Sequence, residues 1–222
     1  MPHPLDKVPR RKARSRKYTG GLQATLRLMR QNMVDGSRQP YIIELAGKAV
    51  ADAGITADRY TDRFAYDVAR LEALYDWVRG NVAYVSDGST ANGKLREVVR
   101  DVEVTLRARS GDCNDHAVLI GALILASFDP VEGKPPVEVW LLCVDGVPVH
   151  VFIVCLIAGP QRTHKMIVDT AARPGRKFGD LPGSKTVDNE PNRLDNVQDG
   201  SNPASSASAH TISYARVDHF FI

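Results

Sequence analysis

The stretch Ser110-Gly111-Asp112-Cys113-Asn114-Asp115 stands directly before the apolar run from Ala117 to Ala126. An uncharged apolar run of this length is typical of a helix that is buried on all sides. Aspartate favours the N-cap and first turn of a helix, and a glycine before it lets the chain turn sharply. The sequence therefore predicts a buried helix that carries Cys113 on its first turn.

The position of Cys113 favours a reactive thiol over a structural one. A helix N-terminus concentrates unpaired N–H groups and positive dipole, and both stabilise the thiolate, which is the nucleophilic form of cysteine. The neighbouring polar residues indicate that the chain lies near solvent here. Asp112, Asp115 and His116 have an alternative interpretation as metal ligands. Exposed capping residues are the simpler interpretation, so we expect neither a metal nor a cofactor.

The other two cysteines, Cys143 and Cys155, lie inside apolar runs rich in β-branched residues. A cysteine in such surroundings is ordinarily a small buried hydrophobe. An odd number of cysteines with this placement favours free thiols over a disulfide framework.

His150 and Asp169 each mark one end of a strand-like run. His150 follows Val149 at the start of the run to Val154, and Asp169 ends the run that begins at Met166. His150 interrupts an otherwise apolar run, whereas the remaining histidines outside the cysteine motif have the default interpretation of surface or satisfied polar residues. Cys113, His150 and Asp169 in this order supply a nucleophile, a base and a carboxylate to orient the base.

These features resemble the transglutaminase-like family of the papain-like cysteine peptidase superfamily. The resemblance rests on Gly111-Asp112-Cys113 at a helix start, a histidine 37 residues later and an aspartate 19 residues after that. The segment from Leu74 to Val85 also resembles the helix and short extended segment that precede the family's cysteine. The resemblance covers about 72–172 and is greatest to phage-encoded members, whose motif is Gly-Asp-Cys-Asp-Asp-like; Asn114 stands at its fourth position here.

The resemblance implies an α+β fold in which N-terminal helices and the nucleophile-bearing helix pack on an antiparallel sheet. It implies acyl transfer from a protein or peptide substrate, by amide hydrolysis or by transfer to an amine, with Cys113, His150 and Asp169 as the catalytic residues. A structural or assembly component of a phage particle, with the same fold and an idle site, is the alternative. An amine acetyltransferase is a third interpretation, disfavoured because no run near the core is suited to the phosphates of coenzyme A.

Four segments follow from composition along the chain. Residues 1–20 read as a basic flexible arm, and 21–172 as the helical part plus the catalytic core. Residues 173–209 are rich in Pro, Gly, Ser, Asn and Asp and read as a long polar loop or a lid. Residues 210–222 read as a last strand and an apolar tail, which is suited to assembly with another chain.

Charge is distributed unevenly along the chain. The net charge is +3, yet residues 1–17 carry seven basic side chains and one acidic side chain. Residues 7–17 therefore have two interpretations, non-specific contact with nucleic acid or another acidic surface, and a solubilising tail. The sequence has no apolar stretch long enough to span a membrane and no secretory signal. We expect a cytoplasmic protein, or a virion protein if the chain is phage-encoded.

Periodicity and turn residues predict the remaining elements. Helices are expected at 22–33, 40–54 and 64–80, and strands at 137–144, 149–157, 165–169 and 211–217. Asp145-Gly146 is typical of a tight hairpin turn. A short helix is expected at 95–99 and an extended segment at 102–106.

Overall fold

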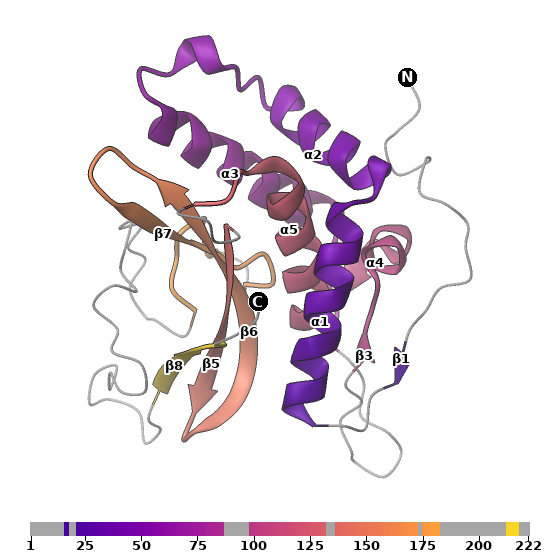
Figure 1. Ribbon diagram of the computed structural model, residues 1–222. Coiled ribbons are helices and arrows are strands. Elements are labelled where there is room, and N and C mark those ends of the chain that lie inside the picture. The colour runs from indigo at the N-terminus through magenta and orange to yellow at the C-terminus, as the bar shows by residue number, and fades with distance from the viewer. Residues whose placement is uncertain are drawn as a thin grey trace.

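A layer of helices covers one face of a curled antiparallel sheet in the computed structural model (Figure 1). The structure describes residues 16–17, 21–86, 98–131, 136–172, 175–182 and 212–217. This arrangement confirms the expected α+β class. Within the described ranges, no helix is both long and apolar enough to cross a membrane.

The helices are α1 (Leu22–Ser37), α2 (Pro40–Asp52), the 3₁₀ turn η2 (Ala57–Arg59), α3 (Arg63–Asn81), α4 (Val102–Ala108) and α5 (Cys113–Ser127). Four of the helices, α1, α2, α3 and α5, lie where the sequence predicts them, with small differences at their ends, whereas α4 and the 3₁₀ turn η2 were not expected as helices. Pro40 occupies the first turn of α2, where its missing N–H costs no hydrogen bond. The Asp62 side chain caps α3 by accepting from the N–H of Ala65 at 2.7 Å.

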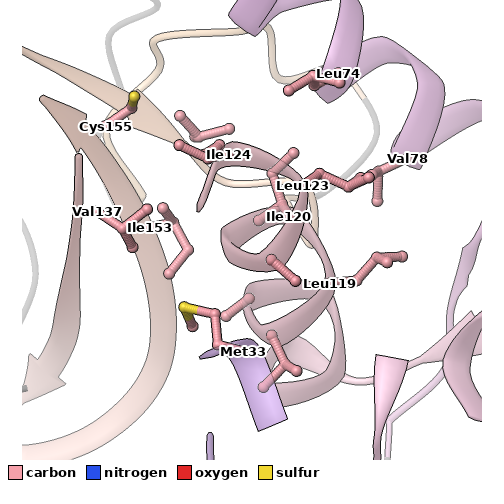
Figure 2. Packing of buried hydrophobic residues seen from close by; sticks show 14 of the residues in the cluster. Met33, Leu74, Val78, Leu119, Ile120, Leu123, Ile124, Val137, Ile153 and Cys155 are labelled. Carbon is pink, nitrogen blue, oxygen red and sulfur yellow. The ribbon is translucent and has the colours of Figure 1, made fainter. Parts of the chain in front are cut away.

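Helix α5 is the centre of the hydrophobic core. Its apolar residues are buried around the whole circumference, and Figure 2 shows side chains of α5 facing α1, α3 and the sheet. Gly121 allows α1 to approach closely, because a Cβ there would lie 2.4 Å from the Sδ atom of Met33. The helix that carries Cys113 is therefore fixed from several sides.

The main sheet has the strand order β7-β6-β5-β8, and all neighbours are antiparallel. Its strands are β5 (Val137–Val144), β6 (Val147–Ala158), β7 (Thr163–Val168) and β8 (Ile212–Arg216). Asp145 and Gly146 join β5 to β6 with φ values of 50° and 77°, as a tight hairpin turn of the primed type requires. The predicted strands and the hairpin are confirmed.

The sheet face away from the helices carries a second apolar cluster. It includes Trp140, Phe152 and Ile167, and the segment 175–182 contributes Leu181. The hydroxyl of Tyr214 on β8 donates to the carbonyl of Pro182 at 2.6 Å. The first part of the predicted polar loop therefore packs against the sheet, while 183–209 lie outside the described residues.

Two short segments differ from the sequence expectation. Val102, Val104 and Leu106 alternate like a strand, but residues 102–108 form α4, because Val102 and Leu106 are four apart and both bury in the core. Val98–Val99 form the strand β3 rather than the end of a short helix, and 95–97 are outside the described ranges.

Two residues of the predicted basic arm form a strand. Arg16–Lys17 form the strand β1, which pairs antiparallel with β3. These two residues belong to the fold, and the rest of the expected arm lies outside the described residues, as does the apolar tail at 220–222.

Candidate active site

Cys113 is the first residue of α5, and a reciprocal pair of hydrogen bonds fixes the start of that helix. Asp112 is the N-cap, and its Oδ1 accepts from the N–H of Asp115 at 3.1 Å. The Oδ2 of Asp115 accepts from the N–H of Asp112 at 3.4 Å. This capping box satisfies two N–H groups at the helix start and sets the position of the Cys113 backbone.

A buried ion pair supports the same turn. The Oδ1 of Asp115 accepts from the N–H of Arg100 at 2.9 Å, and its Oδ2 lies 3.2 Å from the Arg100 guanidinium. The carbonyl of Arg100 in turn accepts from the buried amide of Asn32 on α1 at 3.2 Å. The cysteine turn is thereby connected to α1 through polar groups that have partners.

Gly111 is needed for space rather than for a sharp turn. A Cβ at Gly111 would lie 2.5 Å from the Cβ of Asp115, and Gly111 has no left-handed φ. The left-handed residue before the helix is Arg109, at φ 51°. The expectation that Gly111 turns the chain is therefore wrong, and its role is to admit the Asp115 side chain.

The polar residues of the cysteine motif are buried, contrary to the expectation of exposed capping residues. Asp112, Asn114, Asp115 and His116 are all buried, with Asp115 fully so, and Cys113 itself is half-buried. Buried carboxylates are accommodated here because the helix N-terminus and Arg100 compensate their charge. In the described part of the chain, no three His, Cys, Asp or Glu side chains gather as a metal site.

The side chains of His150 and Asp169 are in contact with each other. His150 lies in β6 and Asp169 directly follows β7, and the Nε2 of His150 is 2.9 Å from the Oδ2 of Asp169. Both side chains are largely buried. Strands β6 and β7 are neighbours, so the sheet register brings the two residues together.

Electrostatics favour a charged imidazole at this position. Burial alone would lower the pKa of His150, but hydrogen-bonding and electrostatic interactions with Asp169 and Cys113 outweigh burial and raise the pKa to about 10. Because Nε2 is engaged by Asp169, Nδ1 is the ring nitrogen left for the thiol. Cys113 and His150 also line one pocket of about 280 Å³.

Two side chains outside the predicted triad, His116 and Arg79, hold the turn after Asp169. The Nδ1 of His116 on α5 lies 3.2 Å from the hydroxyl of Thr170, and Arg79 on α3 donates to the carbonyl of Ala172 at 3.2 Å. Burial lowers the pKa of His116, so its ring is neutral near pH 7. The position of His116 one helical turn after Cys113 is the sequence signal that places it beside that cysteine.

The other cysteines have the surroundings that the sequence predicts. Cys143 and Cys155 are buried in β5 and β6, and all three cysteines are free. Burial raises the pKa of both buried thiols. They are therefore poor nucleophiles in the folded protein.

Comparisons with known proteins give little further information. No family model matches the sequence, and no curated protein is similar to it in sequence. A crystal structure of a candidate protease from Parabacteroides distasonis aligns with a TM-score of 0.37 and 13% sequence identity. The alignment covers 68% of this chain and 30% of that chain, and a similarity at this level assigns neither a fold family nor an activity.

Proposed function

We propose that the protein catalyses cysteine-dependent acyl transfer, as amide hydrolysis or transamidation. Cys113 is the nucleophile, His150 the acid–base group, and Asp169 the group that orients His150 and stabilises its charge. The observation that carries the proposal is the 2.9 Å contact of His150 with Asp169, on an imidazole whose pKa Cys113 also helps to raise. The core is proposed to be transglutaminase-like, which the order of cysteine helix, histidine strand and aspartate supports.

In this proposal the imidazolium of His150 holds Cys113 as a thiolate. The thiolate adds to the carbonyl carbon of an amide, and the tetrahedral intermediate collapses as His150 gives its proton to the departing amine. A thioester on Cys113 and a neutral imidazole remain. Water or a second amine then attacks the thioester while His150 takes its proton, which releases the acid or the new amide and restores the thiolate.

The negative charge that develops on the carbonyl oxygen of the substrate in the tetrahedral intermediate is stabilised by hydrogen-bond donors. The N–H of Cys113 is a first-turn donor without a partner inside its helix, and we assign it one half of that role. Tyr84 is a candidate for the second donor. It lies on β2 (Ala83–Tyr84), which pairs in parallel with β4 (Ser110–Gly111) next to the cysteine, and its side chain is half-exposed.

An acyl-enzyme measurement tests this function without knowledge of the substrate. With p-nitrophenyl acetate, we expect a burst of one p-nitrophenolate per protein and an acetyl group on Cys113 by mass spectrometry. Cys113→Ser should lose the burst, whereas the control Cys143→Ser should keep it. Transfer of the acetyl group to an added primary amine would distinguish transamidation from hydrolysis.

A wild-type protein that acylates no faster than Cys113→Ser would contradict the proposal. It would favour the alternative, a structural component with an idle site.

A further inference from the structure

Six aliphatic side chains line the pocket that contains Cys113 and His150, together with Gly21, Thr25 and Asn114. It lies between the start of α1 and strands β5 and β6, and its volume is about 280 Å³. The aliphatic lining consists of Leu22, Leu26, Leu141, Pro148, Val149 and Val151. This volume lies just below the range for small-molecule pockets, which begins at about 300 Å³, so the pocket is suited to one side chain rather than to a large ligand.

Charge is scarce on the pocket wall. Cys113 and His150 are the only ionisable residues among the described residues that line it. The hydroxyl of Thr25, also on the wall, donates to the carbonyl of Gly21 at 3.4 Å. A charged group placed here would lose hydration without gaining an ionic partner on the aliphatic side.

A second pocket differs from this one in its charged lining. It has a volume of about 430 Å³, and its lining includes Glu72, Asp76, Arg79, Arg176 and Lys177. It contains no cysteine and lies over α3, β7 and the segment 175–182. Of these two pockets, the one at Cys113 is therefore the one that places an aliphatic wall beside a cysteine thiol.

We propose that this pocket binds an uncharged aliphatic group of the substrate, adjacent to the carbonyl that Cys113 attacks. Leu22 and Val149 are 44% and 54% exposed, and the binding of such a group would remove apolar surface of both side chains from water. The inference rests on the proposed function, because it names the substrate class of the same site.

Substituted iodoacetamides test the pocket directly. Each reagent forms the same S–C bond to Cys113 and releases iodide, so that only the group on its nitrogen varies. We would compare N-isobutyl, N-(2-carboxyethyl) and N-(2-aminoethyl) iodoacetamide by mass spectrometry, with each rate normalised to the reaction with glutathione. We expect Cys113 to react at least about tenfold faster with the isobutyl reagent than with either charged reagent.

A charge on the pocket wall should change this preference. In Leu22→Arg, the isobutyl advantage should disappear and the carboxyethyl reagent should become the fastest, because the guanidinium supplies an ionic partner. Ile43→Arg is the matched control, since Ile43 is 51% exposed on α2 and does not line the pocket. This control should keep the wild-type order of rates.

Equal normalised rates for the three reagents, or the same order of rates in Leu22→Arg and Ile43→Arg, would overturn the pocket assignment while leaving a reactive Cys113. A Cys113 that reacts with plain iodoacetamide no faster than the buried Cys143 would instead refute the proposed function, and this inference with it.

Discussion

Asp169 contributes to the site through charge as well as through one hydrogen bond. The contact with His150 is largely buried, so solvent screens it weakly. The pKa of His150 is raised from its ordinary 6.5 to about 10, which means that the folded state holds this proton more tightly than the unfolded chain. The contribution of protonated His150 to the stability of the folded state is therefore complete below about pH 6.5 and is lost as the pH rises through about 10.

Asp169→Asn should remove most of that pH-dependent stabilisation. We expect the variant to unfold with a free energy lower than wild type by roughly 1–3 kcal/mol at about pH 6, and the difference to shrink towards zero above about pH 10. Urea unfolding of both proteins at about pH 6 and above about pH 10 measures this difference in the free energy of unfolding. Asp129→Asn is the control, because Asp129 is exposed and 4.0 Å from Arg63, and it should change little. A difference between Asp169→Asn and wild type that grows with pH would contradict the assignment.

At the scale of elements, the start of α5 depends on how closely β4 passes the first helical turn. Gly111 lies against the side chain of Asp115, which caps the helix and pairs with Arg100. The same turn carries Cys113. Packing, capping and the position of Cys113 are therefore coupled at this one element boundary.

Gly111→Ala should disturb that boundary. The added methyl group would lie within 2.5 Å of the Cβ of Asp115, so we expect a loss of about 1–3 kcal/mol in the free energy of unfolding and slower acylation of Cys113. Gly47→Ala on α2 is the matched control, because a Cβ there meets no atom within 4 Å. The control should be neutral or stabilising by roughly 0.5–1 kcal/mol. Equal stability of the two variants would show that the close contact does not matter.

The sequence predicts the helices and strands that have a long hydrophobic pattern. It does not predict a short helix such as α4 or the burial of the polar residues around Cys113. Helix α5 and strands β5 to β7 have clear periodicity or continuous apolar runs. In the seven-residue α4, the alternating β-branched residues favour a strand, and the single four-residue spacing that accompanies the helix is too short a pattern to predict it. The burial of Asp112 and Asp115 depends on Arg100 and the helix N-terminus, and no local sequence pattern reports that pairing.

At the scale of the whole molecule, the candidate site is assembled from parts that are distant in the chain. Cys113 comes from the central helix, His150 from β6 and Asp169 from the end of β7. The sequence indicated these residues by their order and by their places at element ends. It could not indicate the support from His116 and Arg79, because those contacts depend on how α5 and α3 dock beside the turn after Asp169.

Removal of residues 1–15 tests the proposal that the basic N-terminus contacts nucleic acid or another acidic surface. These residues hold five of the seven basic side chains in 1–17 and few large apolar ones, and the truncation retains Arg16 and Lys17 of β1. We expect the midpoint of thermal unfolding to stay nearly unchanged. Binding to a DNA duplex should weaken and lose most of its salt dependence. A truncated protein that unfolds, or that binds DNA as before, would contradict this expectation.

The most direct test of the central proposal is the rate of Cys113 alkylation by iodoacetamide as a function of pH. In the wild-type protein, we expect labelling of Cys113 to be fast already at mildly acidic pH, with Cys143 and Cys155 unlabelled until the protein unfolds. In His150→Ala, Cys113 should react appreciably only at alkaline pH, because the imidazolium that stabilises the thiolate is gone. Equal labelling of the three cysteines, or a pH profile that His150→Ala leaves unchanged, would contradict the assignment of Cys113 and His150 as a working pair.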